Sequence, residues 1–190
     1  MERQERLLIK SEEIERIIGR MAHEIVERNG GLEDLTLIGI RTRGAELVRR
    51  IAHKIAAFSG SAPPVGIIDV TPYRDAQKRV VSGEDSLPIE APFSLDDKRV
   101  VLIDDVIYTG RTIRAALDLM THWGRPRRVL VAVLVDRGER ELPIKADIVG
   151  KNIQVSESER VNVFFRESDG ADQVTVSKDQ HGALRRPNNP

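Results

Sequence analysis

The segment Val100–Thr112 reads Val-Val-Leu-Ile-Asp-Asp-Val-Ile-Tyr-Thr-Gly-Arg-Thr and places two adjacent carboxylates beside a turn of small residues. Its aliphatic run predicts a central parallel strand that is buried on both faces and ends at Asp104 and Asp105. Ligands of open α/β sheets bind at the carboxyl ends of the strands. Adjacent carboxylates there can accept hydrogen bonds from vicinal hydroxyl groups, so the segment predicts a site for a sugar.

The turn after this acid pair suits a phosphate group. Backbone N–H groups at Gly110 and at the start of the following helix form an anion cradle together with the hydroxyls of Thr109 and Thr112. The chain contains neither G-x-x-x-x-G-K-[ST] nor G-x-G-x-x-G, which disfavours nucleoside triphosphate hydrolysis and dinucleotide binding. The two neighbouring sites therefore predict a sugar phosphate ligand, with a solvated Asp-Asp turn as the purely structural alternative.

The composition fits one soluble domain. The 190 residues are 40% hydrophobic, and we expect residues 1–176 to form a single domain and residues 177–190 to form a disordered tail. The absence of cysteine excludes disulfides and cysteine nucleophiles. No apolar run is long enough for a signal peptide or a membrane span, which predicts a cytoplasmic protein without membrane contact. Thirty basic residues balance thirty acidic ones, so nucleic acid could bind only at a local basic face.

Helices and strands alternate along the predicted domain. Ser11 is the expected N-cap of a first helix that ends at Asn29-Gly30-Gly31, and further helices are predicted at Glu46–Phe58 and from Ile113 to about His122. Strands are predicted at Leu35–Ile40, Val65–Val70, Val100–Ile103 and Val129–Val135, with shorter candidates at Asp147–Val149 and Val161–Phe165. The prolines and the many charged residues of Thr71–Pro92 predict a long mobile loop or a hairpin. This order predicts an α/β fold with a central parallel sheet flanked by helices.

Charged segments follow three more of the predicted strands, at the same edge of the sheet. Arg41–Gly44 brings two guanidinium groups, which suit pyrophosphate because each can donate paired hydrogen bonds to phosphate oxygens. Tyr73–Asp75 lies on the long loop, and Asp136–Gly138 follows the strand that starts at Val129. A capping turn, a solvated loop and a simple turn are the structural alternatives for these three segments.

The segment Val100–Thr112 resembles the phosphoribosyl pyrophosphate (PRPP) signature of the type I phosphoribosyltransferases, because hydrophobic run, acid pair and Thr-Gly-x-Thr turn occur in that order. Over about residues 10–165 the chain is also similar to the family of bacterial pyrimidine operon regulators, which are uracil phosphoribosyltransferases as well. The similar segments are Met21–Asn29, Gly39–Gly44, Tyr73–Asp75, Leu134–Gly138, Arg140–Ile144 and Gly150–Ile153.

This resemblance implies a type I phosphoribosyltransferase fold with a small hood built from the C-terminal part, and the reaction of uracil with PRPP to give UMP and pyrophosphate. Asp104 and Asp105 would hold the ribose hydroxyls, while Arg74 on the closing loop would neutralise the departing pyrophosphate. Magnesium is expected to be held mainly through PRPP oxygens, without a direct protein ligand. The residues implied to bind PRPP or the nucleotide are Arg41, Thr42, Arg43, Gly44, Val106, Ile107, Tyr108, Thr109, Gly110, Arg111 and Thr112.

Two further features of the family concern the pyrophosphate loop and the base. The resemblance makes Arg41–Gly44 the pyrophosphate loop, which often contains a cis non-proline peptide in this family. Uracil is expected to bind near Val135, Asp136 and Arg137, mainly through backbone groups. Two alternatives stay open: a catalytically weak RNA-binding attenuator that senses UMP or UTP, and a phosphoribosyltransferase for a purine or orotate.

The regulators of this family bind pyrimidine-leader mRNA in response to uridine nucleotides. The implied RNA-binding residues are Arg16, Arg20, His23, Arg140 and Lys145, and a homo-oligomer is expected. The first three share one face of the first helix, although such a polar face is ordinarily just solvated. The family commonly has Thr where this chain has Gly19 and His where it has Glu139. Because phosphate contacts dominate RNA affinity, we expect these departures to weaken binding.

Overall fold

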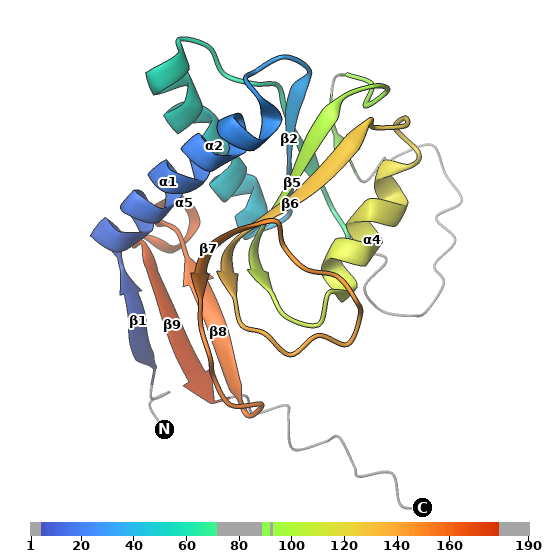
Figure 1. Ribbon diagram of the computed structural model, residues 1–190. Coiled ribbons are helices and arrows are strands. Elements are labelled where there is room, and N and C mark those ends of the chain that lie inside the picture. Colours follow the sequence, from blue (N-terminus) through green and yellow to red (C-terminus); the bar gives the residue numbers. More distant parts are fainter. Residues whose placement is uncertain (1–4, 72–88, 92, 179–190) are drawn as a thin grey trace, which may run out of the picture.

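A six-stranded sheet forms the centre of the molecule (Figure 1). The computed structural model describes residues 5–71, 89–91 and 93–178. The strands are β2 (Leu35–Ile40), β3 (Val65–Ile68), β4 (Ile89–Glu90), β5 (Arg99–Ile107), β6 (Arg128–Asp136) and β7 (Ile148–Asn152). Their order is β4-β3-β2-β5-β6-β7, with β4 antiparallel to β3 and all other neighbours parallel. The predicted central parallel sheet is thus confirmed.

Helices cover both faces of this sheet. On one face lie α1 (Ser11–Asn29) and α2 (Arg43–Ser59), and on the other lies α4 (Arg111–Met120) (Figure 1). Side chains of β6 alternate between the two layers: Ala132 and Leu134 pack with α1 and α2, while Val131 and Val133 pack with α4. Strands buried on both faces explain the continuous apolar runs in the sequence. They also fix the carboxyl ends of β2, β5 and β6 next to one another.

A second, three-stranded sheet completes the described part of the chain. It contains β1 (Arg6–Lys10), β9 (Gln173–Lys178) and β8 (Glu159–Phe164), in that order and antiparallel, and the short helix α5 (Arg166–Asp169) connects β8 to β9. We call these four elements the hood. The hood was expected from the C-terminal part alone, but the first described strand of the chain forms one of its edges. Ser177 and Lys178 belong to β9, so the predicted disordered tail started too early.

Several element boundaries differ from the sequence predictions. Strand β5 continues three residues beyond Asp104, because Val106 and Ile107 still pair with β6. Helix α2 starts at Arg43, within the predicted pyrophosphate loop rather than after it. Lys10, and not Ser11, is the N-cap of α1, and it makes no side-chain capping hydrogen bond. Tertiary pairing and packing therefore extend β5 and α2 beyond the ends that local sequence signals indicate.

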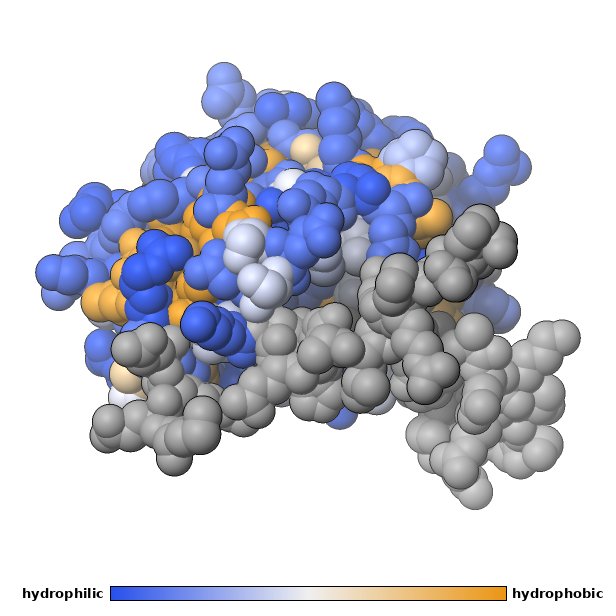
Figure 2. Space-filling model, turned by 90° about the horizontal axis from the view of Figure 1, so that it is seen from below, coloured by the Kyte–Doolittle hydropathy of each residue, from blue (hydrophilic) through white to orange (hydrophobic). Residues whose placement is uncertain are grey.

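The predicted loop Thr71–Pro92 returns to the central sheet through β4, which pairs antiparallel with β3 as the hairpin alternative requires. Arg74 and its neighbours lie outside the described residues. Seen from below, the described surface is mostly hydrophilic with scattered apolar patches (Figure 2). Leu7 and Phe58 are the exposed large apolar side chains of the described chain. No helix within these residues is long and apolar enough to cross a bilayer.

Candidate active site

A cavity of about 410 Å³ lies where the ends of β2 and β5 meet the start of α4 and the hood. Its lining contains most of the residues that were predicted to bind PRPP. They are Arg41, Thr42, Arg43, Asp104, Asp105, Val106, Ile107, Tyr108, Thr109, Gly110 and Thr112, joined by Ile113, Arg137, Arg160 and Val161. Of the predicted set, Gly44 and Arg111 do not line the cavity. The topology therefore brings together segments that are more than a hundred residues apart in the sequence.

The acid pair lies within β5 at one wall of the cavity. Asp104 is 6% exposed, and its Oδ1 accepts a hydrogen bond of 2.9 Å from the backbone N–H of Asp105. The carboxylate of Asp105 accepts one of 2.9 Å from the N–H of Val106. Burial raises the pKa of the Asp105 carboxyl, a shift that the positive charge of Arg43 reduces. The pair thus concentrates negative charge where a sugar or a developing cation would bind.

The predicted pyrophosphate loop forms the neighbouring wall. The peptide bond between Arg41 and Thr42 is cis, as the family resemblance implied. The backbone N–H of Arg41 donates to the carbonyl of Ile68, and its side chain contacts Asp69 and Glu90. Burial raises the pKa of Asp69, but hydrogen bonds from Thr71 and the charge of Arg41 outweigh it, so the net shift is downward. Arg41 is therefore held at the rim by carboxylates and by the sheet.

Gly44 supports this loop from below. A Cβ atom at this position would lie 2.7 Å from the carbonyl oxygen of Ile103 and 3.3 Å from Cα of Asp104. Helix α2 can approach β5 this closely only because residue 44 has no side chain. The sequence prediction gave Gly44 a role in ligand binding, whereas the structure places it under the acid pair as a contact between backbones.

The predicted phosphate turn leads from β5 into α4. Gly110 is the N-cap of α4 and has a φ of 90°, a conformation that favours glycine. The carbonyl of Thr109 accepts hydrogen bonds of 3.1 Å from the N–H groups of Glu141 and Leu142. Arg111 points to Glu141, with 2.6 Å between Nη2 and Oε2, and not into the cavity. The N–H of Arg111 donates to Oγ1 of Thr109, and Thr109, Gly110 and Thr112 line the cavity at the start of α4. First-turn N–H groups without an intrahelical partner suit a phosphate at this place.

Of the three predicted base-binding residues at the end of β6 and directly after it, one, Arg137, lines the cavity. The guanidinium of Arg137 lies 3.8 Å from the ring centroid of Tyr108 and donates a hydrogen bond of 2.9 Å to the carbonyl of Glu159. Its Nε atom is buried without a hydrogen-bond partner in the described part of the chain. Val135 is buried in the core, and Asp136 is bound by Arg140 at 2.6 Å. Neither of these two lines the cavity.

Besides Ile113 of α4, two cavity residues of the hood, Arg160 and Val161, were not predicted to belong to the site. Both belong to β8 of the hood, and Val161 also packs in the core. A basic residue next to an apolar one at the start of a short strand does not by itself indicate a binding site. Only the docking of the hood against β5 brings Arg160 to the site.

The predicted RNA-binding residues occupy two different environments. Arg16, Arg20 and His23 are exposed on α1, where Arg20 donates to the carbonyls of Val149 and Gly150 and His23 stacks on Phe58 with ring centroids 4.0 Å apart. Lys145 is also exposed.

Arg140, in contrast, is turned inward. Its guanidinium donates to the carbonyls of Ile144, Tyr108 and Gly138 as well as to Asp136, and its side chain is 19% exposed. These contacts make Arg140 a support for the segment between the phosphate turn and Ile144. Its charge is therefore much less available to RNA than the sequence prediction assumed.

Comparisons with known proteins agree with this geometry. Residues 8–167 match the family described as phosphoribosyl transferase domain. The hypoxanthine phosphoribosyltransferase of Trypanosoma cruzi shares the fold with a TM-score of 0.69 at 20% identity, covering 91% of this chain and 96% of that chain. A hypoxanthine phosphoribosyltransferase from Staphylococcus aureus gives a TM-score of 0.67 at 20% identity, with 90% and 92% covered. Fold and family match together define a phosphoribosyltransferase.

Relatives of higher identity narrow this class. The Bifunctional protein PyrR of Chloroflexus aurantiacus is 52% identical over 172 residues, which are 90% of this chain and 94% of that protein. The Bifunctional protein PyrR of Thermus thermophilus is 53% identical over 169 residues, or 89% and 93% of the two chains. The protein of the same name from Deinococcus radiodurans is 48% identical over 169 residues, or 89% and 92%. The chain therefore belongs to the PyrR family of phosphoribosyltransferases.

Proposed function

We propose that this protein transfers the phosphoribosyl group of PRPP to uracil, giving UMP and pyrophosphate, and that it also regulates pyrimidine genes by binding their leader mRNA. The observation that carries the enzymatic half is the single cavity that unites acid pair, pyrophosphate loop and phosphate turn. Each of the three suits one part of PRPP: the ribose hydroxyls, the pyrophosphate and the 5′-phosphate. The name shared by the relatives supports the second, regulatory half.

Catalysis in this proposal is mainly positioning and charge stabilisation. The first-turn N–H groups of α4 and the hydroxyls of Thr109 and Thr112 bind the 5′-phosphate, aided by the positive end of the helix dipole. Asp104 and Asp105 accept hydrogen bonds from the ribose hydroxyls and face the positive charge that develops as the glycosidic bond breaks. Bringing the base into line with the ribose removes much of the entropic cost of the reaction, and no covalent nucleophile is needed.

Magnesium fits the proposed site as a partner of PRPP. The described residues contain no group of three or more His, Asp or Glu side chains that could hold a metal ion by themselves. Magnesium retains several waters and binds substrate phosphates, which suits an ion held mainly by PRPP oxygens and water without a direct protein ligand. When bound, the ion neutralises charge on the departing pyrophosphate. Arg74 of the long loop would add to this neutralisation.

One assay tests the enzymatic proposal. The protein is incubated with PRPP, magnesium and one base at a time, namely uracil, hypoxanthine, guanine or orotate, and pyrophosphate release is measured. We expect release with uracil alone. Release with another base would change the substrate assignment, and binding of UMP without any turnover would favour a catalytically weak regulator.

The regulatory proposal rests on the exposed side chains of Arg16, Arg20 and His23 on α1, with Lys145 as a further contact. Exposed cations bind RNA phosphates, and the affinity then falls with salt. We expect pyrimidine-leader RNA to bind with clear salt dependence and to respond to UMP or UTP, which a gel-shift titration at two salt concentrations measures. Salt-independent binding would remove α1 from the RNA site. Light scattering of the same samples tests the expected homo-oligomer.

A further inference from the structure

Arg43 connects the pyrophosphate loop to the hood. It is the first residue of α2 and lines the cavity, where its charge offsets part of the rise that burial causes in the pKa of Asp105. Its Nη2 atom donates a hydrogen bond of 2.6 Å to Oδ1 of Asp169 in α5, and its Nε atom donates one of 3.2 Å to the carbonyl of Val163 in β8. Both acceptors belong to the hood, about 120 residues further along the chain.

Asp169 is itself held rigidly. Its second oxygen accepts a hydrogen bond of 2.9 Å from the backbone N–H of Phe165 and one of 3.2 Å from the hydroxyl of Ser168. Its side chain is 16% exposed, and Phe165, on which the turn rests, is fully buried. An acceptor whose other oxygen is fixed in this way can hold a long arginine side chain in one orientation.

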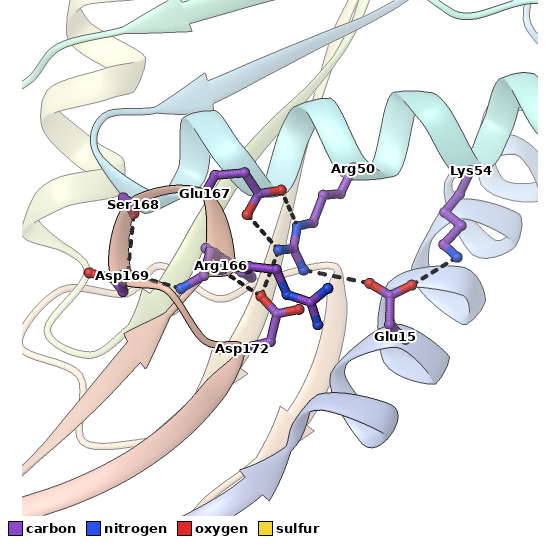
Figure 3. A network of polar contacts seen from close by, with 9 residues as sticks. Glu15, Arg50, Lys54, Arg166, Glu167, Ser168, Asp169 and Asp172 are labelled. Atoms are coloured by element: carbon purple, nitrogen blue, oxygen red, sulfur yellow. Dashed lines mark hydrogen bonds and ion pairs between the residues drawn. The ribbon is translucent and has the colours of Figure 1, made fainter.

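The rest of the α5 turn is anchored separately on α2 (Figure 3). Arg50, two turns after Arg43, binds both oxygens of Glu167 at 2.9 and 2.5 Å and Oδ1 of Asp172 at 2.6 Å. Asp172 also accepts a hydrogen bond of 2.7 Å from the N–H of Arg166. The turn therefore stays docked through Arg50 even when the contact between Arg43 and Asp169 is removed, so the two contacts can be perturbed independently.

We propose that Asp169 is a positioning residue for phosphate recognition, which holds the Arg43 guanidinium at the cavity wall and thereby sets the affinity for the pyrophosphate group of PRPP. The inference rests on the proposed phosphoribosyltransferase function and assigns a hood residue to its pyrophosphate subsite. A free arginine would lose side-chain freedom when pyrophosphate binds, whereas an arginine already ordered by Asp169 and Val163 avoids this cost. Two of its guanidinium nitrogens bond to the hood, and the remaining N–H donors are available to the ligand.

The test compares Asp169→Ala with Glu167→Gln, a matched change in the same turn that touches Arg50 only. Steady-state kinetics with varied PRPP and calorimetric titration with inorganic pyrophosphate and magnesium are measured for both. We expect Asp169→Ala to raise the KM for PRPP and the Kd for pyrophosphate by about fivefold to tenfold, with kcat within about twofold and an unchanged KM for uracil. Glu167→Gln is expected to change none of these values, even if it lowers the unfolding temperature.

A double-mutant cycle separates positioning from a general structural role. In an Arg43→Ala background, Asp169→Ala should add little to the KM for PRPP, because the side chain that it orients is gone. Asp169→Asn keeps one oxygen acceptor, should give a smaller rise than Asp169→Ala, and carries the test if the alanine variant does not fold.

Three results would overturn the proposal. The first is an unchanged or lower KM for PRPP in Asp169→Ala, since a lower value would make Asp169 a competitor of pyrophosphate for Arg43. The second is an equal rise in Glu167→Gln, and the third is a fully additive double mutant. Wild-type protein that releases no pyrophosphate with any base would refute the proposed function instead, and the pyrophosphate titration would still test the role of Asp169.

Discussion

Replacing Gly44 with alanine tests the close contact between α2 and β5 that places the pyrophosphate loop beside the acid pair. The added carbon would lie 2.7 Å from the Ile103 carbonyl oxygen, whereas ordinary contact begins at 3.4 Å, so about 0.7 Å must be gained. The opposing atoms are backbone, and no rotamer change can relieve the contact. Overpacking of this kind costs about 1–3 kcal/mol, which outweighs the gain of up to about 1 kcal/mol that alanine offers within a helix.

A shift of this size separates two parts of the site that must act on one substrate. Displacements of about 1 Å can reduce turnover by about a hundredfold, so we expect a loss of at least about tenfold in Gly44→Ala. Urea unfolding and pyrophosphate release measure the two effects.

Gly19→Ala in α1 is the matched control, because a Cβ atom there meets nothing within 4 Å. It should raise the free energy of unfolding by about 0.5–1 kcal/mol and leave pyrophosphate release unchanged. If Gly44→Ala is as stable and as active as Gly19→Ala, the reasoning about the close contact is refuted.

Four further predictions concern single side chains. Asp105→Asn should lower pyrophosphate release at least about tenfold without lowering the free energy of unfolding at neutral pH. Burial raises the pKa of this carboxyl, so its ionised form destabilises the folded protein, and this destabilisation disappears as pH falls through the raised pKa. Arg74→Ala should reduce kcat more than PRPP affinity, since a loop residue that meets pyrophosphate only on closure acts mainly in the transition state; unchanged kinetics would contradict this. Asp172→Asn should lower the free energy of unfolding by about 2 kcal/mol at neutral pH, because Arg50 loses a charged partner. Although burial raises the pKa of Asp172, the hydrogen bond from Arg50 brings it below its ordinary value of 3.8, so urea unfolding should show this difference shrinking as pH falls through that lowered pKa. Glu139→His should tighten pyrimidine-leader RNA at low salt more than at high salt, and equal binding of both proteins would argue against an RNA contact at this position.

The central sheet and most of the cavity lining could be predicted because their signals are local. Doubly covered parallel strands need long apolar runs, and ligands of such sheets bind at the strand ends, so the position of Asp104 in the sequence already indicated its position in the fold. The glycine and threonines of the phosphate turn are likewise required by local backbone geometry.

The features that were missed depend on partners far away in the sequence. Strands β1 and β9 are short, and Arg6 pairs with Val176, so neither strand is specified by its own residues. Arg140 carries the charge expected of an RNA contact, and only the fold reveals that Tyr108 and Asp136 occupy its donors. Gly44 was predicted as a ligand-binding residue, and only its close distance to the backbone of β5 reveals its role in packing.

The strand order of the hood has a consequence for protein synthesis. β9 lies between β1 and β8, so β1 has no partner in this sheet until residues 173–178 have left the ribosome. The central strands end at Asn152, and β8, which provides one wall of the cavity, is synthesised before its pairing partner β9. A nascent chain can therefore form the turn before α4 and the acid pair before β9 has been synthesised, whereas the sheet of the hood is complete only after it. A chain truncated before β9 would keep Asp104 and Asp105 but would lose the strand that pairs with both β1 and β8.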